Sequence, residues 1–476
     1  MQNKNRKVRP GTGRPGGSGP ARPSRPAGGP EVRSLDNPRL VAVRVLDDVL
    51  GKEAYAAFSL DDRLNGARLI QLDRRLCASI VYRTLENLYL LDYALSGFLR
   101  EPENLNMTVR NILRTAACQI LLHDRIPDSA AVNEAVRLTR SMDLEGFSGM
   151  VNAVLRRLVD HRDEIVWPGE DEGARFLSIR FSLPEWLAEQ LIRDYGFEEA
   201  RAIASFRTEK HAVILRPTYG REKEFRERLD KKVWEKENGL FPGAVRIYGA
   251  VQIARDSDYL SGLFSVQGEG SMIAAESVGV RPGMNVLDCC AAPGGKTAYL
   301  AERMEGTGRV YAWDLHSHRV ELIRAMTRRL HLENVRMAAR DAKVFREEME
   351  GCMDAVLLDA PCSGLGVMDD KPDVKYRHDR ESVDALILEQ RMLLDTCCRY
   401  VKPGGILVYS TCSILKDENE RQIARFLSDH PEFSPDALPG SVPAVFRDRA
   451  GEYGLQLLPC RDGVEGFFVA RLKRRG

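Results

Sequence analysis

The chain has 476 residues, of which 43% are hydrophobic and 29% are charged, and its formal net charge is +1. This length predicts about two to four domains, and the balanced charge means that any basic surface for nucleic acid must be local. No apolar run approaches the roughly 18 residues that a membrane span needs, and the N-terminus lacks the apolar core of a secretory signal. The cysteines include no CxxC pair, which argues against a disulfide framework or a metal site and favours a reducing cytoplasm.

Residues 1–35 differ in composition from the rest of the chain. They are rich in Gly, Pro, Lys and Arg and carry few large apolar side chains. Such a segment cannot bury enough apolar surface to order itself, so we predict a disordered basic tail. The tail is either a solvated extension or a weak, salt-sensitive contact to RNA.

Residues 36–165 are predicted to form an all-helical domain. Asn37 and Pro38 suit the N-cap and the first position of a helix, and Val41, Leu46 and Val49 follow at helical spacing. No alternating strand pattern interrupts this segment. Basic residues recur along it and form either a solvated face or an RNA contact. They are Arg74, Arg75, Arg83, Arg114, Arg137, Arg140, Arg156 and Arg157.

Residues 166–264 are predicted to form a helical linker and a small α+β module that binds RNA. The stretches LPEWLAEQLIRDYG and FEEARAIASFRTE have helical periodicity. After them, AVILRPT and AVRIYG alternate as strands do, on either side of the charged helix REKEFRERLDKK.

Residues 265–476 change to an alternation of strands and helices. The strand candidates are MNVLDCC, RVYAWDL, VRMAAR, DAVLLDA, GILVYST and GFFVARL. This alternation is typical of an α/β domain with a doubly wound, Rossmann-like parallel sheet. Ligands of such sheets bind at the carboxyl ends of the strands.

A Gly-rich turn, LDCCAAPGGKT, follows the first of these strands. A P-loop would need glycine where the chain has Cys290, and the G-x-G-x-x-G dinucleotide fingerprint is also absent. Asp314 ends the next strand, where an acid can accept both ribose hydroxyls, and Asp341 follows the third strand, within reach of an adenine amino group. A helix N-cap is the alternative for either acid alone, but together with the turn they suit S-adenosylmethionine.

Two cysteines, Cys362 and Cys412, lie just after apolar strands in turns rich in Ser, Gly and Pro. A thiolate that attacks carbon 6 of cytosine makes carbon 5 nucleophilic enough to take a methyl group from a sulfonium. A second cysteine could assist the release of the product, and Asp359 could hydrogen-bond the activated base. Six other cysteines are predicted to be buried and inert: Cys77, Cys118, Cys352, Cys397, Cys398 and Cys460.

The stretches DCCAAPGGKT, AWDLHSHR, RDA, DAPCSGLGV and YSTCSILKDENE resemble the motif set of the RNA cytosine-5 methyltransferases, the Sun/NOL/NSUN family. The resemblance covers residues 265–475. Residues 36–165 resemble the NusB-type RNA-binding domain, and the order of domains resembles the bacterial RsmB-type enzymes, which modify small-subunit (16S) ribosomal RNA. We therefore expect an S-adenosylmethionine-dependent RNA cytosine-5 methyltransferase, acting as a cytoplasmic monomer on ribosomal RNA.

The resemblance also implies roles for single residues. It makes Cys412 the nucleophile and Cys362 the group that helps to release the product. The residues implied to hold S-adenosylmethionine or the target base are Cys290, Ala291, Ala292, Pro293, Gly294, Gly295, Lys296, Asp314, Arg319, Asp341 and Asp359. The chain departs from the family pattern at LRPT, where Arg216 matches and Thr218 does not, and at EGFF, which begins with Glu465. Both departures concern expected peripheral RNA contacts.

Several alternatives stay open. By analogy with DNA cytosine-5 methyltransferases, Cys362 would be the nucleophile. The substrate could be tRNA instead of ribosomal RNA. It could also be a small molecule, but the domains that precede the α/β domain would then have no function. The chain could also be a non-catalytic RNA-binding assembly or antitermination factor, although a scaffold has no use for both cysteines.

Overall fold

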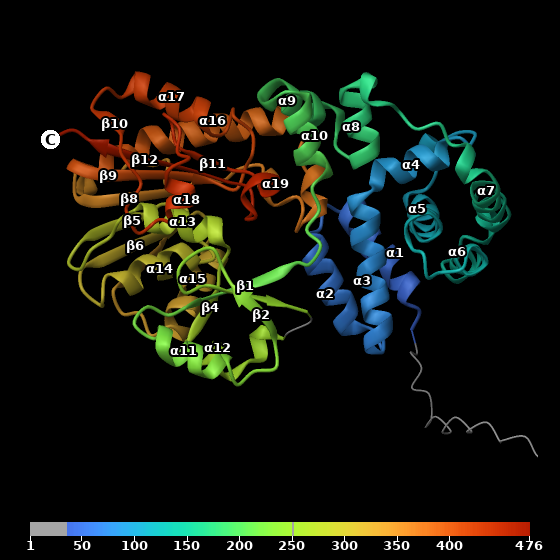
Figure 1. Cartoon of the computed structure of the whole chain (residues 1–476), viewed down its shortest axis with the longest axis horizontal. Coiled ribbons are helices and arrows are strands. Elements are labelled where there is room, and N and C mark those ends of the chain that lie inside the picture. Colours follow the sequence, from blue (N-terminus) through green and yellow to red (C-terminus); the bar gives the residue numbers. More distant parts are fainter. Residues whose placement is uncertain (1–35, 250–251) are drawn as a thin grey trace, which may run out of the picture.

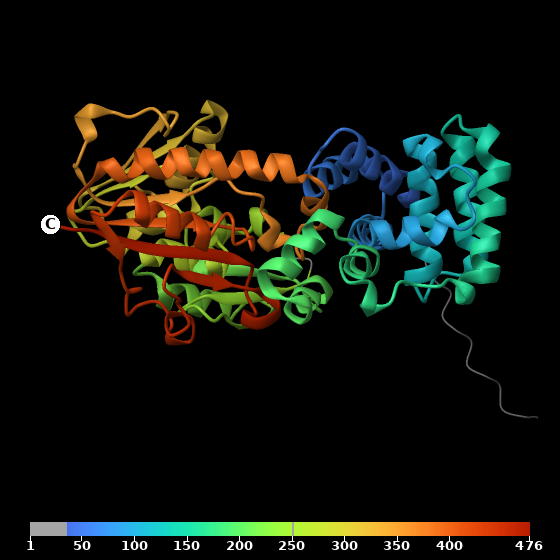
Figure 2. The same cartoon turned by 90° about the horizontal axis from the view of Figure 1, so that it is seen from above.

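The computed structural model describes residues 36–249 and 252–476, so the predicted tail at 1–35 lies outside the described residues. A helical domain lies at one end of the long axis and the α/β domain at the other (Figures 1 and 2). No helix in the described ranges has the length and apolar composition needed to cross a membrane.

The helical domain is built around one central helix, α5, whose side chains are buried on almost every face. Asn37 caps the first helix as predicted, because its side chain accepts a hydrogen bond from the backbone N–H of Arg39 at 2.9 Å. The helices are α1 (Pro38–Gly51), α2 (Ala56–Gly66), α3 (Gln71–Glu86), α4 (Leu88–Ser96), α5 (Met107–Leu122), α6 (Asp128–Ser141) and α7 (Ser148–His161). Their apolar faces form two clusters, one around α1 and α3 and the other around α5.

Three further helices connect this domain to the rest of the chain: α8 (Ala174–Phe181), α9 (Glu185–Tyr195) and α10 (Phe197–Ser205). They lie between the two ends of the molecule (Figure 1). Leu187 and Leu191 of α9 share an apolar cluster with Ile414 and Leu415 of the α/β domain, and the Tyr195 hydroxyl donates to the backbone oxygen of Ile414 at 2.6 Å. This segment therefore packs as part of the α/β domain and does not behave as a free linker.

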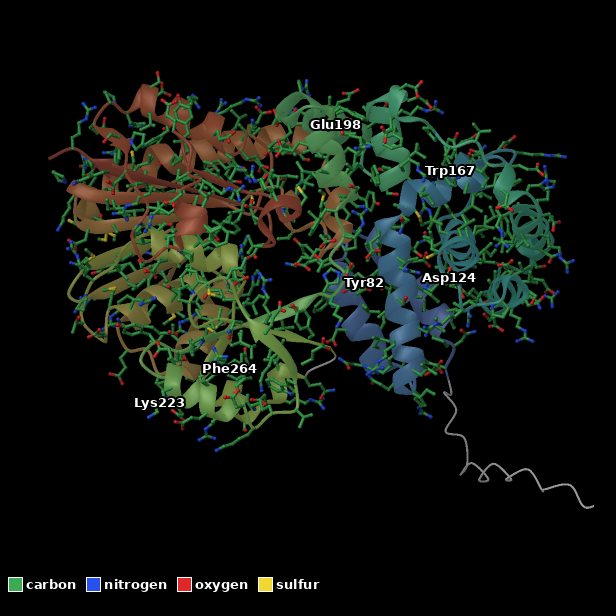
Figure 3. The ribbon with its side chains drawn as sticks, viewed as in Figure 1. Tyr82, Asp124, Trp167, Glu198, Lys223 and Phe264 are labelled. Atoms are coloured by element: carbon green, nitrogen blue, oxygen red, sulfur yellow. The ribbon has the colours of Figure 1, made fainter. Side chains whose placement is uncertain are left out.

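The small module is a four-stranded antiparallel sheet in the order β2-β3-β1-β4, with a helix of two turns, α11, and a shorter helix, α12. Phe264 lies in its core, where its ring is 5.7 Å from that of Phe225, whereas Lys223 is exposed on the outer helix (Figure 3). The elements are β1 (Ala212–Pro217), α11 (Glu222–Leu229), β2 (Glu235–Asn238), β3 (Val245–Tyr248), α12 (Ser257–Leu260) and β4 (Phe264–Val266).

Arg216 joins the small module to the α/β domain through a buried ion pair. Its guanidinium donates to both carboxylate oxygens of Glu302, at 2.6 and 3.0 Å, and to the side-chain oxygen of Gln267 at 2.8 Å. The side chains of Arg216 and Glu302 are only 7% and 2% exposed. The match of Arg216 to the family pattern therefore has a structural basis in this ion pair, which fixes the small module to α14.

Arg216→Met is expected to lower the free energy of unfolding by about 3–5 kcal/mol, because it leaves Glu302 charged and unpaired in the interior. Urea denaturation of the full chain, followed by tryptophan fluorescence, measures this loss. The matched control is Arg221→Met, which breaks a half-exposed pair with Glu224 and should change the free energy by about 0–1 kcal/mol. Equal losses of free energy for the two variants would contradict the conclusion that the Arg216–Glu302 ion pair is a buried structural contact.

The α/β domain contains one sheet with the order β10-β12-β9-β8-β5-β6-β7, and β11 pairs with β12. The strands from β7 to β9 are parallel, as predicted, but β12 runs antiparallel to β9, so the sheet is mixed. The strands are β5 (Asn285–Asp288), β6 (Arg309–Asp314), β7 (Val335–Ala339), β8 (Met353–Asp359), β9 (Val401–Thr411), β10 (Phe433–Pro435), β11 (Leu455–Leu457) and β12 (Phe467–Arg474).

Helices cover both faces of this sheet, as a doubly wound fold requires. Apolar residues of α13, α14 and α15 form the cluster on one face, and those of α16 and α17 form the cluster on the other. The chain leaves β5 toward β6 and later returns to β8 on the other side, which creates a switch point at the carboxyl end of β5. The helices are α13 (Glu269–Ser277), α14 (Gly295–Arg303), α15 (Ser317–Arg329), α16 (Arg380–Cys397), α17 (Glu420–Asp429), α18 (Ala444–Arg447) and α19 (Pro459–Asp462).

The short 3-10 helix Pro372–Tyr376 connects the α/β domain directly to the helical domain. Lys375 donates from Nζ to the backbone oxygen of Glu86 at 3.0 Å, and the Tyr376 hydroxyl donates to that of Leu85 at 2.7 Å. These contacts hold the helical domain beside the end of α16 that points toward it (Figure 2).

Candidate active site

Two cysteines meet at the carboxyl edge of the sheet. Cys362 follows β8 and Cys412 follows β9, and these strands are parallel neighbours in which Asp359 pairs with Ser410. Because neighbouring parallel strands end at the same edge, the two loops lie side by side. The sulfur atoms of Cys362 and Cys412 are 3.4 Å apart. This agrees with the expectation that the two thiols lie close together.

The contact between the two sulfur atoms shifts the pKa values of the two thiols in opposite directions. The hydrogen bond with the Cys362 thiol is the largest effect that holds the pKa of Cys412 below its ordinary value. Burial and the negative charge of Asp359 oppose it, and the Lys296 ammonium lowers this pKa. The same hydrogen bond, together with burial, raises the pKa of Cys362 well above its ordinary value. The pair is therefore polarised, in that Cys412 loses its proton more readily than Cys362.

Lys296 and Asp359 form an ion pair directly beside Cys412. Lys296 Nζ lies 2.8 Å from Asp359 Oδ2, and the Ser410 hydroxyl donates to Asp359 Oδ1 at 2.7 Å. Burial alone would lower the pKa of Lys296, but the attraction of Asp359 outweighs it and leaves this pKa raised. Lys296 therefore carries a full positive charge near the thiolate.

The turn before α14 has a backbone conformation that requires glycine, and hydrogen bonds from its backbone hold it in place. Gly294 has φ 109°, and a Cβ atom there would lie 3.2 Å from the Cα of Ile323, so a side chain would be both strained and crowded. Asp314 accepts from the backbone N–H of Ala292 at 3.3 Å through Oδ2 and from that of His316 at 3.1 Å through Oδ1. The turn and the end of β6 are thus fixed to each other.

A cavity of about 360 Å³ opens between this turn and the two cysteines, within the range typical of small-molecule sites. Asp314, Asp341 and Asp359 present carboxylates to it from the ends of three strands. Eight of the residues predicted for the site line the cavity: Cys290, Ala292, Asp314, Arg319, Asp341, Asp359, Cys362 and Cys412.

The other predicted residues of the turn do not line the cavity themselves. The backbone N–H of Ala291 donates to the Trp313 oxygen at 2.7 Å, and Gly294 and Gly295 begin α14. Pro293 is exposed. Burial raises the pKa of the Cys290 thiol well above its ordinary value, so Cys290 acts as a wall of the cavity and is not a second nucleophile.

The residues around the turn fit a cationic nucleoside cofactor. Asp288, just before the turn, is fully buried, and burial raises its pKa to about 7. Its Oδ2 accepts from the Thr297 hydroxyl at 2.6 Å, whereas Oδ1 has no hydrogen-bond partner among the described residues. A buried acceptor without a donor is costly, and an ammonium or another donor of a ligand would satisfy it.

Comparison with known proteins agrees with this geometry. The model of the family "16S rRNA methyltransferase RsmB/F" matches residues 277–473, and that of the NusB family matches residues 36–160. "Probable ribosomal RNA small subunit methyltransferase B" of Bacillus subtilis (strain 168) is 33% identical over 444 residues, which cover 92% of this chain and 99% of that protein. The chain belongs to the RsmB/F methyltransferase family.

Two further similarities extend over nearly the whole chain. Ribosomal RNA small subunit methyltransferase B of Xanthomonas campestris pv. campestris is 33% identical over 439 residues, which cover 91% of this chain and 96% of that protein. The crystal structure of PH0851 matches with a TM-score of 0.77 at 26% identity and covers 93% of this chain and 100% of that chain. The combination of a helical domain, a small module and an α/β domain is therefore shared with relatives of this RsmB/F chain.

Three buried polar residues behind the cysteines were not predicted as part of the site: Gln390, Glu418 and Asn419. Asn419 Oδ1 accepts from the Thr411 hydroxyl at 2.6 Å, and Gln390 Nε2 donates to the Pro361 oxygen at 3.0 Å. The sequence did contain a signal for two of them, since DENE is a polar run between a strand and a helix that both pack into the core.

Two expectations about individual residues, Arg114 and Cys352, are wrong, and Glu465 has a structural contact. Arg114 is buried and pairs with Asp92 at 2.6 Å, so it belongs neither to a solvated face nor to an RNA contact. Glu465 is partly buried, and its carboxylate accepts from the backbone N–H of Gly270 at 3.0 Å, so it holds the start of α13. Cys352 is exposed instead of buried, because it lies in the turn before β8.

Proposed function

We propose that this protein methylates carbon 5 of a cytosine in small-subunit ribosomal RNA, through a covalent adduct between the base and Cys412. The observation that carries the proposal is the pair of thiols 3.4 Å apart at the edge of a cavity lined by carboxylates. A structural cysteine pair would not need a cavity beside it or a lowered pKa at one of the two thiols.

S-adenosylmethionine fits the cavity and, when bound, supplies the methyl group from its sulfonium. Asp314 would accept the ribose hydroxyls and Asp341 would accept from the adenine amino group, since both lie at strand ends that line the cavity. Asp288 lies just before the turn and does not line the cavity. Ala292 and Arg319 would form the wall beside the ribose.

Cys412 would begin the reaction on the base. Its thiolate attacks carbon 6 of cytosine, a carbon–sulfur bond forms, and the electron pair of the 5,6 double bond shifts toward carbon 5 and the ring. Asp359 and Lys296 lie beside the sulfur, where they can hydrogen-bond the exocyclic amine and the polarised ring. Carbon 5 then has the electron pair that forms the new bond to the methyl group.

Cys362 would act in the release of the product. After methylation, carbon 5 loses its proton to a base, the pair of that C–H bond restores the double bond, and the carbon–sulfur bond to Cys412 breaks. Cys362 holds its proton 3.4 Å from the departing sulfur and can stabilise the thiolate that leaves. The polarisation of the pair therefore supports Cys412 as nucleophile and Cys362 as release group.

The domain order supports ribosomal RNA as the substrate. The curated relatives at 33% identity carry the name ribosomal RNA small subunit methyltransferase B, and residues 36–160 match the NusB family. The helical domain is fixed to the α/β domain through Lys375 and Tyr376. An RNA bound to the helical domain would thus be held at a set distance from the cysteines.

The full chain, incubated with S-adenosylmethionine labelled in its methyl group and with unmodified small-subunit ribosomal RNA, is expected to label only 5-methylcytidine. Digestion of the RNA to nucleosides followed by chromatography identifies the product. An unmodified tRNA pool serves as the matched control and should stay unlabelled. A different labelled nucleoside would contradict the cytosine-5 chemistry, and label in tRNA alone would contradict the ribosomal target.

A further inference from the structure

Glu418 lies between the two cysteine loops, yet it does not line the cavity. It precedes α17 and is completely buried. Its Oε1 accepts from the backbone N–H of Ser363 at 2.9 Å, and its Oε2 accepts from the Ser363 hydroxyl at 2.6 Å and from the hydroxyl of Ser413. Gln390 Nε2 adds a further donor to Oε1 at 3.0 Å.

This carboxylate has no cationic partner. Within the described residues, no Lys, Arg or His lies within ion-pair distance of Glu418, and only neutral donors surround it. Burying a carboxylate without a cation is unfavourable unless its hydrogen bonds are nearly complete. An apolar side chain of similar volume would pack at lower cost, so packing alone does not account for this residue.

The residues that Glu418 contacts explain what the carboxylate does. Ser363 directly follows Cys362, and Ser413 directly follows Cys412. The two serine hydroxyls also lie 3.2 Å from each other. One side chain therefore fixes the backbone that follows each thiol, although the two loops are about fifty residues apart in the sequence.

We propose that Glu418 is a positioning residue that clamps the Cys362 and Cys412 loops together and so keeps the two thiols in contact. This inference rests on the proposed function, because it assigns Glu418 to the control of the nucleophile. The Cys412 hydrogen bond and burial are the largest effects that raise the pKa of Cys362, and the negative charge of Glu418 raises the pKa of both thiols. The clamp therefore acts on the thiol pair through its geometry, by holding the two sulfur atoms 3.4 Å apart. The charged groups that face the two thiols are Lys296, Asp359 and Glu418.

Glu418→Gln tests the proposal, because the amide has the same shape but no charge. Its NH2 group would face groups that donate hydrogen bonds to the carboxylate in the wild type. The protein alone, without RNA or S-adenosylmethionine, is treated with iodoacetamide between pH 6 and 9, and peptide mass spectrometry measures the modification of each cysteine. In the wild type, Cys412 should react ahead of Cys362. In the variant, this preference is expected to be lost, because a looser clamp weakens the contact between the two sulfur atoms that holds the pKa of Cys412 down.

The matched control is Glu302→Gln, which removes a buried carboxylate that contacts neither cysteine loop. Both variants should lower Tm, but only Glu418→Gln should lose the preference for Cys412. An unchanged preference in folded Glu418→Gln, or an equal loss in Glu302→Gln, would overturn the proposal. If Glu418→Gln does not fold, Ser413→Ala removes one side of the clamp and leaves the carboxylate in place, and an unchanged preference there would overturn the proposal equally.

This experiment separates the two proposals, since alkylation does not depend on methyl transfer. If the RNA contained no 5-methylcytidine, the cytosine-5 chemistry would fail while the thiol preference could still depend on Glu418. If 5-methylcytidine formed but Glu418→Gln kept the wild-type preference, only the positioning role would fail.

Discussion

A Cys362→Ala variant is expected to accumulate a covalent complex with RNA, whereas Cys412→Ala is expected to form none. In the first variant the thiolate of Cys412 still attacks the base, but the thiol that lies 3.4 Å from the departing sulfur is missing. In the second variant the nucleophile itself is absent, and methyl transfer should fall by a factor on the order of 10⁴ to 10⁶, as after removal of other catalytic nucleophiles.

A denaturing protein gel measures the complex after each variant has been mixed with total ribosomal RNA and S-adenosylmethionine. Cys352→Ala is the matched control, because this thiol is exposed and lies away from the cavity, and it should behave like the wild type. A retarded band with Cys412→Ala would instead assign the nucleophile to Cys362, as in the DNA cytosine-5 methyltransferases. That outcome would also contradict the polarisation of the pair toward Cys412.

The position of the cysteines was predictable because it depends on topology and not on side-chain packing. Two parallel strands next to each other end at one edge, so residues that follow β8 and β9 must meet there. The same rule predicted that Asp314 and Asp341 would reach the cavity from β6 and β7. In each case, the pattern of a short apolar strand followed by a polar residue was sufficient to predict where that residue lies.

Residues whose role depends on distant partners were not predictable in this way. Arg216 lies within the alternating strand β1, where an exposed arginine would give the same pattern, and only the structure shows that Glu302 of α14 is 2.6 Å away. Glu418 is one acid among several in a polar run, and its partner Ser363 is 55 residues away. The direction of β12 relative to β9 could likewise not be predicted from its alternating pattern, because parallel and antiparallel strands have the same pattern.

The packing of α8, α9 and α10 illustrates the same limit at the level of domains. Their helical periodicity was clear, but periodicity indicates only that one face is buried and does not identify the neighbour. In the structure, the neighbour is the loop that follows Cys412, where Tyr195 holds the Ile414 oxygen. The segment predicted as a linker therefore supports the catalytic edge from outside.

Lys296→Met is expected to move the acid limb of the pH–rate profile for methyl transfer to higher pH. The reactive form of Cys412 is the thiolate, which is present above the pKa of this group and lost as the pH falls through it. Lys296 is one of the groups that hold this pKa down. Without the ammonium the pKa of Cys412 rises. At neutral pH the rate should therefore fall, and raising the pH should recover part of the loss.

The measurement is the initial rate of methyl transfer to small-subunit ribosomal RNA between pH 6 and 9.5, at saturating S-adenosylmethionine. Lys402→Met is the matched control, since it removes a lysine that pairs with Asp354 at the opposite end of the sheet, and its acid limb should coincide with that of the wild type. A Lys296→Met variant that is slower by the same factor at every pH would show that Lys296 acts only through Asp359 and the substrate. The shift of the limb, not the loss of rate, therefore decides whether the ammonium stabilises the nucleophile.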